Sequence, residues 1–248
     1  MSDLDPQPGE TLDRLSRSLR LLQRVRGHRA TSDDVILAGL AARYAPRARR
    51  ILDLGSGKGT VALLLARRLP HSRIIGVEAV AESHALAIRN ARLNGLSDRY
   101  EARLADLRDP EVLRGEPPFD LICGAPPFMR PGTGVLPTDP QRAAGRFELR
   151  GGVEDYVAAA ASRQGGTVVM LVDGTGGPRL ELAFARAGLG MTHLITVVPR
   201  PGRPATYCIG IAGAGPGRPD TTLPMRGPAG DAWSPAYAEL RAELELDA

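Results

Sequence analysis

Short apolar runs alternate with amphipathic segments over most of the chain, which predicts β-strands that are each followed by an α-helix. The predicted strands cover residues 51–54, 73–78, 101–107, 119–125, 167–173, 192–198 and 207–212. The predicted helices between them cover residues 61–69, 81–96, 153–164 and 179–187. The last two strands are separated by residues 199–205, which are too few for a crossover helix and predict an antiparallel pair. The expected fold class is α/β, a Rossmann-like sheet of seven strands with an antiparallel last hairpin.

Segments outside this alternation are assigned from their caps, glycines and prolines. Ser234, followed by Pro235, predicts the start of a terminal helix. Residues Met129–Gly145 are rich in Gly and Pro and have no periodicity, which predicts a loop of a length usually kept for substrates. Residues Gly213–Gly230 predict a Gly/Pro linker. From Thr11 to Val25 the apolar spacing fits a helix or a strand, and periodicity leaves both open.

Another helix start is predicted just before the first strand of the sheet. Thr31 or Ser32 is placed to cap it, and Asp33 and Asp34 in its first turn suit the positive end of the helix dipole. A ligand-binding role for the two aspartates remains open beside this capping role.

The stretch Ile51–Thr60 reads I-L-D-L-G-S-G-K-G-T, an apolar strand that breaks into three glycines and then begins a helix. Glycines at alternate positions let a ligand approach the backbone above a helix N-terminus. A dinucleotide pattern does not fit because Thr60 holds its third glycine position, and a P-loop does not fit because Leu52 holds its first. The residues do fit the pattern D-x-G-x-G-x-G, which begins at Asp53. The alternative is a glycine-rich turn that binds no ligand.

Acidic residues end the next two predicted strands. Glu78 follows the glycine turn by about 20 residues, the spacing at which a carboxylate binds ribose hydroxyls. Asp106 ends the strand after that, where the alternative is an aspartate that caps a loop. The carboxyl ends of parallel strands meet at one edge of a sheet, and Asp53 and Ala125-Pro126 fall at the same edge. The sequence therefore predicts a ligand site there.

Composition adds little to this interpretation. The chain has 248 residues, 43% of them hydrophobic, enough for one sizeable core. Its net charge of +4 is compatible with nucleic acid, but Lys58 is its single lysine, and abundant arginine weakens the charge argument. Cys123 and Cys208 lie in separate apolar runs, which predicts buried, reduced thiols. No signal peptide or long apolar stretch is visible, so we expect a cytoplasmic protein without a membrane partner.

The motifs, taken in order, resemble those of the bacterial tRNA adenine-N6 methyltransferases, which modify the adenosine next to the anticodon of a valine tRNA. These are class I S-adenosylmethionine (SAM) methyltransferases. The resemblance runs almost end to end, although each motif is of modest specificity. The segments that carry it are T-L-D-R-L, Gln23, G-H-R-A-T-S-D-D-V-I-L-A, I-L-D-L-G-S-G-K-G, G-V-E, R-N-A-R-L-N-G-L, A-D-L-R-D, F-D-L-I-C and W-S-P-A-Y.

The resemblance implies SAM as cofactor and assigns residues to it. Three glycines would shape the turn under its methionine part, Glu78 would accept its ribose hydroxyls, and Asp106 its adenine amino group. The implied cofactor residues are Arg29, Thr31, Asp53, Gly55, Ser56, Gly57, Gly59, Glu78, Ala79, Asp106 and Leu107. The implied substrate residues are Phe128, Arg146 and Glu148.

The chain departs from the family at the catalytic tetrapeptide, which is Ala125-Pro126-Pro127-Phe128 where the family has Asn-Pro-Pro-Tyr. In the family the asparagine and the first proline carbonyl accept the two N–H bonds of the adenine amine, and the aromatic residue stacks on the base. Phe128 can still stack, but Ala125 has no side-chain acceptor. A second departure is His28, which replaces an aromatic residue; it is expected to be solvated, and a catalytic role is the alternative.

The resemblance leaves three functions open. The first is methylation of an adenine amino group in RNA without a metal; the second is methylation of a small molecule or a protein; the third is SAM binding without catalysis. A nucleotide-dependent oxidoreductase is a distant alternative. We expect a monomer or a weak dimer. The expected organisation is an N-terminal extension over the cofactor site (1–30), the methyltransferase domain (31–212), and a linker with a terminal helix (213–248).

Overall fold

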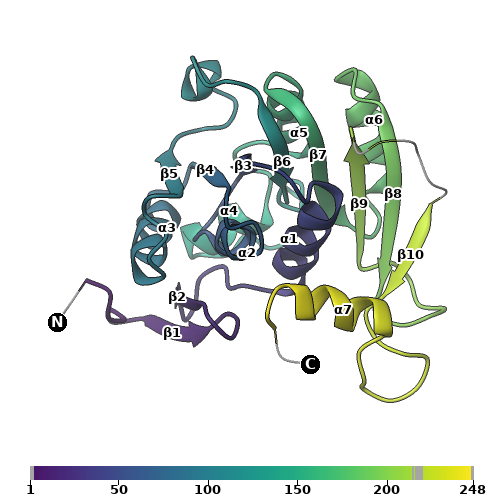
Figure 1. Ribbon diagram of the computed structural model, residues 1–248, viewed down its shortest axis with the longest axis horizontal. Helices are drawn as coiled ribbons and strands as arrows, with labels where there is room; N and C mark the ends of the chain where they lie inside the picture. The colour runs from purple at the N-terminus through teal and green to yellow at the C-terminus, as the bar shows by residue number, and fades with distance from the viewer. Residues whose placement is uncertain (1–2, 214, 216–219, 247–248) are drawn as a thin grey trace.

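The computed structural model describes residues 3–213, 215 and 220–246. Its main feature is an eight-stranded sheet with the strand order β10-β8-β9-β7-β6-β3-β4-β5 (Figure 1). The neighbours are parallel except at β9, which is antiparallel to β7 and to β8. The predicted sheet and its antiparallel last hairpin are confirmed, and β10 adds an eighth strand. The strands are β3 (Arg50–Leu54), β4 (Arg73–Glu78), β5 (Tyr100–Leu104), β6 (Phe119–Gly124), β7 (Gln164–Asp173), β8 (Met191–Val198), β9 (Tyr207–Ala212) and β10 (Thr221–Pro224).

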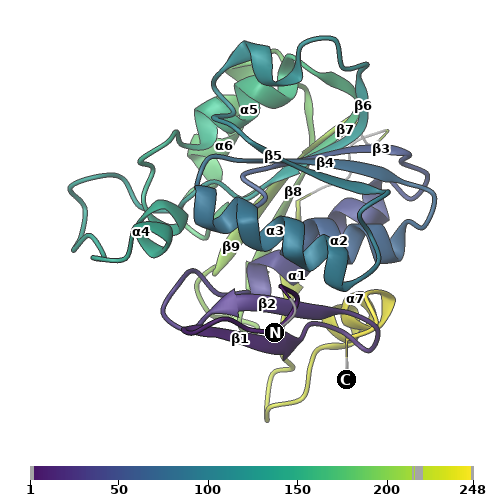
Figure 2. The same ribbon diagram turned by 90° about the vertical axis from the view of Figure 1, so that its left-hand side faces the viewer.

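Helices cover both faces of this sheet (Figure 2). In β3, Ile51 packs into the core on one face, whereas Leu52 and Leu54 pack into the core on the other. Because both faces are buried, the central strands are continuous apolar runs, which is why they could be located in the sequence. One face carries α1 (Ser32–Tyr44), α2 (Thr60–Arg68) and α3 (Ala81–Leu93); the other carries α5 (Val153–Ala161) and α6 (Gly177–Arg186), with a short 3-10 helix at Pro110–Leu113.

The two cysteines are buried and free, as predicted. Cys123 lies on β6 and Cys208 on β9. Burial of the Cys123 thiol raises its pKa well above the usual range, because the thiolate would lie in the apolar core next to the carboxylate of Asp53. It therefore behaves as a small apolar core residue.

The N-terminal segment forms a hairpin of two strands, β1 (Glu10–Arg14) and β2 (Arg20–Arg24). Its anchor on α3 is the fully buried Asn90, which accepts a hydrogen bond from the N–H of Leu22 (2.7 Å) and donates one to its carbonyl (3.0 Å). A two-stranded hairpin is marginal by itself, so its strand conformation depends on such tertiary contacts. Local periodicity could not decide this.

Two segments predicted to lack helices or strands contain one. The predicted loop Met129–Gly145 contains most of α4 (Pro140–Arg146), where Asp139 caps the helix by accepting from the N–H of Arg142 (2.8 Å). The predicted linker Gly213–Gly230 contains β10, which pairs with β8 at the edge of the sheet. Both elements are short and partly exposed, so their residues show no periodic apolar pattern.

Several predicted helix ends lie too far along the chain. α3 ends at Leu93 instead of Leu96, and α5 ends at Ala161 instead of Gln164. Gln164 instead begins β7. Apolar residues beyond a helix end, such as Leu96, are buried in the core and extend the apparent period.

Ser234 caps the terminal helix α7 (Pro235–Glu243), as predicted, and also links it to β10. Its Oγ accepts from the N–H of Tyr237 (3.2 Å) and donates to the carbonyl of Pro224. We expect Ser234→Ala to lower the free energy of unfolding by about 1–2 kcal/mol in urea denaturation, because the cap is lost. Ser234→Thr keeps the hydroxyl and should lie within about 0.5 kcal/mol of wild type. Equal stability of Ser234→Ala and wild type would contradict this role.

Candidate functional site

Two adjoining cavities lie at the carboxyl ends of β3, β4 and β6. The first, called here the narrow pocket, has a volume of about 100 Å³ and includes residues of β4, α4 and α5. The second, called the wide cleft, has a volume of about 550 Å³ and includes the start of α1, the glycine turn and the segment after β6. This is the edge of the sheet at which the sequence predicted a ligand site. Five residues line both cavities: His28, Gly55, Gly57, Ala125 and Gly145.

The glycine turn joins β3 to α2 in a conformation that favours glycine. Gly55 has φ +65°, and a Cβ there would lie 2.2 Å from the hydroxyl oxygen of Tyr156. Gly57 has φ +57°, with no atom within 4 Å of where its Cβ would be. The backbone above α2 is therefore open to a ligand, which fits the predicted role of the turn.

Glu78 ends β4 and lines the narrow pocket. Its carboxylate accepts hydrogen bonds from the N–H groups of Gly57 (2.8 Å) and Val80 (2.7 Å). Burial raises its pKa, and these backbone N–H groups oppose that rise. A carboxylate has about four lone-pair sites, so Glu78 is fixed in place by backbone N–H groups and keeps acceptor capacity for the ribose.

A buried acidic cluster with one lysine lies beneath the wide cleft. Asp53 is 2% exposed, and its Oδ2 has no hydrogen-bond partner in the described part of the chain. Burial raises the pKa of Asp53, and the neighbouring carboxylates Asp34 and Glu78 raise it further. Burial likewise raises the pKa of Asp34 to about 6 and lowers the pKa of Lys58. An unpaired buried carboxylate oxygen suits a cationic ligand group.

These features fit SAM. Its sulfonium and ammonium groups are positive and suit the acidic cluster, and its ribose suits Glu78. The buried Oγ of Thr60, at the start of α2, is another polar atom without a partner in the described residues and is available to the ligand. The predicted cofactor residues Arg29, Thr31 and Ser56 line the wide cleft, and Ala79 and Leu107 line the narrow pocket.

Two predicted cofactor residues lie outside the lining of both cavities. Asp106 is held by Arg108, whose Nε (2.9 Å) and Nη2 (2.6 Å) donate to its carboxylate, and this contact lowers the pKa of Asp106. Gly59 has φ +87° at the start of α2, and a Cβ there would lie 2.9 Å from the ring of Tyr100. Gly59 therefore shapes the turn, and the assignment of Asp106 to the cofactor stays a prediction.

The tetrapeptide after β6 divides between the two cavities. Ala125 lines both, Pro126 and Phe128 line the wide cleft, and Pro127 lines the narrow pocket. The ring of Phe128 lies 6.1 Å from that of Tyr207, which begins β9, and the hydroxyl of Tyr207 is 3.1 Å from Oγ of Ser32. The wide cleft thus has an aromatic wall beside the position where the family's asparagine would stand.

The two predicted substrate residues near α4 are placed differently. Arg146 is exposed and lines the wide cleft. Glu148 lines neither cavity and pairs with Arg179 of α6, which also donates to Glu154 of α5 (2.7 Å). In this structure Glu148 therefore tethers the segment after α4 to α6.

Several lining residues were not assigned to the site from the sequence: His28, Lys58, Tyr156 and Tyr207. Lys58 was visible inside the glycine motif. Tyr156 on α5 and Tyr207 on β9 gave no signal, because their segments reach the site through the packing of α5 and the pairing of β9.

Among the residues that the structure describes, no group of three metal-binding side chains gathers. None of the described helices meets the length and apolarity that crossing a bilayer requires.

Comparisons with known proteins agree with this geometry. Residues 31–137 match the methyltransferase small domain. The chain is 34% identical over 157 residues to the tRNA1(Val) (adenine(37)-N6)-methyltransferase of Enterobacter sp. strain 638, covering 61% of this chain and 62% of that protein. It is 38% identical over 97 residues to the release factor glutamine methyltransferase of Geobacter sulfurreducens, covering 39% of this chain and 32% of that protein. The chain thus spans less than two thirds of the length of these relatives. The predicted resemblance to the adenine-N6 family is confirmed at this level.

Solved structures agree on the fold. A predicted O-methyltransferase from Agrobacterium tumefaciens superposes with a TM-score of 0.66 at 22% identity, covering 86% of this chain and 97% of that chain. A ribosomal protein L11 methylase from Lactobacillus delbrueckii subsp. bulgaricus superposes with a TM-score of 0.53 at 18% identity, covering 81% and 96%. At these sequence identities the superposition shows a shared fold and not a shared activity.

Proposed function

We propose that this chain, whose residues 31–137 match the methyltransferase small domain and whose cofactor is SAM, methylates an adenine amino group in RNA in the cytoplasm. SAM supplies the methyl group as a carbon bound to a positively charged sulfur. The chain's own residues must hold the cofactor, place the acceptor nitrogen beside that carbon and take up the proton which the amine loses. The acidic cluster and Glu78 provide the first of these functions.

The observation that carries the choice of a base as acceptor is the aromatic wall of the wide cleft. Phe128 and Tyr207 offer rings on which a planar base taken out of its helix can stack. The Pro126 carbonyl is available to accept one N–H bond of the base's amino group, as the resemblance implies. The relatives named as adenine-N6 methyltransferases support the same choice.

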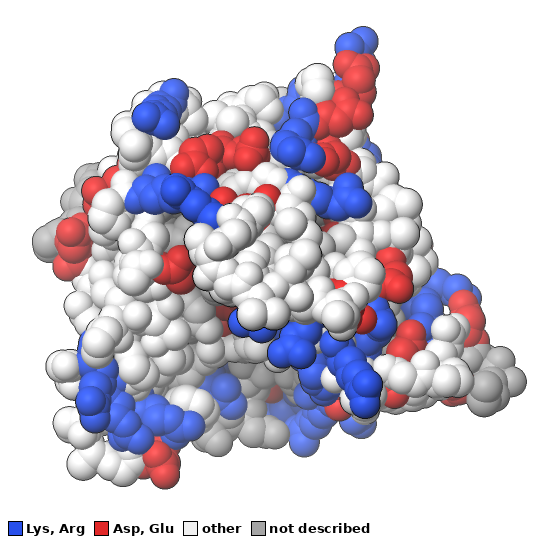
Figure 3. Space-filling model, turned by 180° about the vertical axis from the view of Figure 1, so that it is seen from behind, with Lys and Arg blue, Asp and Glu red and all other residues white. Residues whose placement is uncertain are grey.

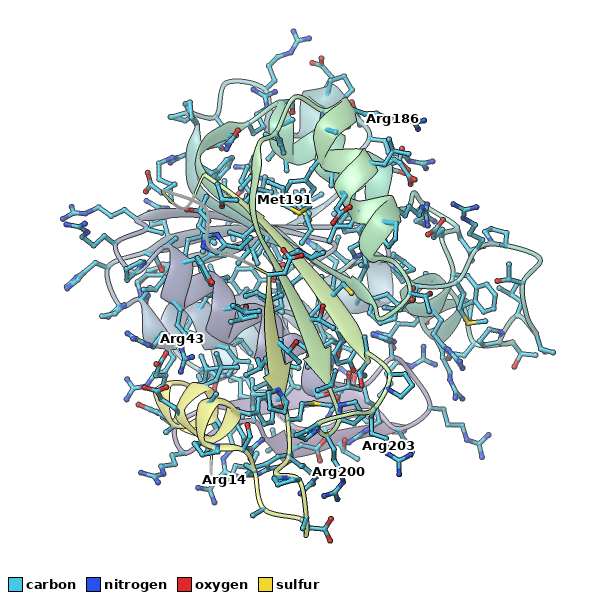
Figure 4. The ribbon with its side chains drawn as sticks, turned by 90° about the vertical axis from the view of Figure 1, so that its right-hand side faces the viewer. Arg14, Arg43, Arg186, Met191, Arg200 and Arg203 are labelled. Atoms are coloured by element: carbon cyan, nitrogen blue, oxygen red, sulfur yellow. The ribbon has the colours of Figure 1, made fainter. Side chains whose placement is uncertain are left out.

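Arginines around the wide cleft support RNA over a free base. Arg26, Arg142 and Arg146 are exposed and line it. Figure 3, which shows the side of the molecule on which α4 lies, has basic side chains gathered below its centre and again at its lower left. Figure 4 shows Arg203 pointing outward from the loop between β8 and β9, just before Tyr207, whereas the neighbouring Arg200 pairs with Asp231 (2.9 Å). Such positions suit contacts to phosphates on both sides of a flipped base.

A second candidate acceptor is the side-chain amide of a protein glutamine, which is also a planar NH₂ group. The observation that favours it is Ala125, which leaves room between the two cavities where the adenine-N6 family has asparagine. Relatives named as release factor glutamine methyltransferases support this alternative. A small metabolite would fit the same space.

Transfer of a labelled methyl group from SAM separates these acceptors. The protein is incubated with total tRNA, with a protein extract or with a small-molecule extract, and labelled RNA is digested for nucleoside analysis. We expect label in tRNA, recovered as N6-methyladenosine. Label confined to the protein or small-molecule fraction would contradict the RNA proposal, but it would still support methyltransferase activity.

Phe128→Ala should lower the rate of methyl transfer into RNA about tenfold, because stacking of a base on an aromatic side chain contributes about 1–3 kcal/mol. The SAM affinity, measured by calorimetry, should change less than about twofold, since the ring lies against Tyr207 and is not among the residues assigned to the cofactor. Phe128→Tyr keeps the ring and is the matched control. A loss of SAM affinity as large as the loss of turnover would show that Phe128 serves the cofactor instead.

A further inference from the structure

The boundary between the narrow pocket and the wide cleft is built almost entirely from residues without functional side chains. Of the five residues that line both cavities, three are glycines and one is Ala125. His28 is the fifth. Of these five described residues, it is the one whose side chain can accept or donate a hydrogen bond. A cofactor with its ribose at Glu78 of the narrow pocket and its positively charged sulfur at the acidic cluster of the wide cleft crosses this boundary, so His28 lies beside the cofactor and the acceptor.

The ring of His28 is held in place by packing. A Cβ at Gly145 of α4 would lie 2.6 Å from Cγ of His28, so the ring rests against the α4 backbone. The backbone N–H of His28 donates to Oε1 of Gln141, also on α4 (3.3 Å). Neither ring nitrogen of His28 makes a hydrogen bond to a described residue, and neither nitrogen is fully buried. The ring therefore presents free nitrogens at the boundary.

The surroundings of His28 keep this ring neutral. Burial lowers its pKa, and the positive charges of Lys58, Arg146 and Arg142 lower it further, against the opposing carboxylate of Asp33. These groups come from the glycine turn, α4 and α1, the elements around the ring. At neutral pH the imidazole therefore has a free lone pair on one nitrogen.

We infer that His28 is the catalytic base of this site and supplies the acceptor that Ala125 lacks, an inference that rests on the proposed transfer to an adenine amine. The amine nitrogen forms a new C–N bond to the methyl carbon while the C–S bond of the cofactor breaks, and its electron pair stays on sulfur. The nitrogen then carries one proton too many. A ring nitrogen of His28 accepts that proton, and the imidazolium releases it to solvent through the open cleft.

The test compares His28→Phe and His28→Gln with wild type, from pH 5 to pH 9. We expect His28→Phe to lower the rate of methyl transfer about a hundredfold. The wild-type rate should fall as pH falls through the pKa of His28, below its usual 6.5, because the protonated ring cannot accept a proton. His28→Gln keeps an acceptor that does not titrate, so its rate should be intermediate and should lose this acid limb. SAM affinity should change less than about twofold in both variants.

A readout independent of turnover is the imidazole NMR titration of the protein, with the four histidines distinguished by comparison with His28→Phe. We expect a neutral His28 at pH 7, with a pKa that matches the acid limb of the rate. His71→Phe, at an exposed turn, is the control and should leave rate and pH profile unchanged.

Three results would overturn the role of His28: a wild-type rate in His28→Phe, an acid limb that survives in His28→Gln, or a ring protonated at pH 7. Failure of the proposed function looks different. In that case wild type labels no RNA while another fraction is labelled, and the His28 variants are measured on that fraction.

Discussion

A Glu78→Ala variant should bind SAM roughly 10- to 150-fold more weakly than wild type in calorimetry. Charge-assisted hydrogen bonds of the kind expected from this carboxylate to the ribose contribute about 1.5–3 kcal/mol. The change also removes the acceptor of the Gly57 and Val80 N–H groups, which loosens the glycine turn over which the cofactor lies. Glu78→Gln keeps the shape and one acceptor oxygen, and we expect it to lose less affinity.

Glu82→Ala is the matched control. Glu82 lies four residues further along the chain, pairs with Arg24 (2.7 Å) and lines neither cavity of the site. It should bind SAM as wild type does. Thermal melts establish that each variant is folded before its affinity is compared. An unchanged SAM affinity in folded Glu78→Ala would move the ribose site away from β4.

Ala125→Asn should raise methyl transfer into RNA tenfold or more when it is made in the His28→Phe variant. The new amide oxygen can accept an N–H bond of the adenine amine, and one such bond in the transition state contributes about 3 kcal/mol. In the otherwise wild-type chain the gain should be smaller, because His28 already supplies an acceptor at the same boundary. The four rates form a double-mutant cycle that measures how far the two side chains replace each other.

No gain on any RNA in either background, beside wild-type turnover of a protein or a small molecule, would show that the site has adopted another acceptor. In that case asparagine would crowd a space shaped around a methyl side chain. Ala125→Ser is a useful comparison, because it adds an acceptor with little volume.

The sequence determined the centre of the sheet and the cofactor edge of the site. β3, β4 and β6 are buried on both faces, so each is a short apolar run that needs no other part of the chain to be recognised. The glycine turn is equally local, because Gly55, Gly57 and Gly59 adopt positive φ within five residues. Glu78 could be predicted as a site residue because a strand end in a parallel sheet has a known edge.

The tertiary structure decided the peripheral elements and the acceptor side of the site. The hairpin of β1 and β2 depends on Asn90, and β10 depends on its pairing with β8. Asp106 and Glu148 have the residue type expected of ligands, yet Arg108 and Arg179 engage them. The sequence shows that an acidic residue carries a charge, but it does not show which residue will pair with that charge.

His28, Tyr156 and Tyr207 are the opposite case: they line the site but were not assigned to it from the sequence. They come from the segment before α1, from α5 and from β9, and they meet at the site through the order in which strands pair and helices pack. Local sequence determines the conformation of a turn or a strand, because that depends on neighbouring residues. Which side chains share a cavity depends on contacts between distant segments, and only the folded chain brings those together.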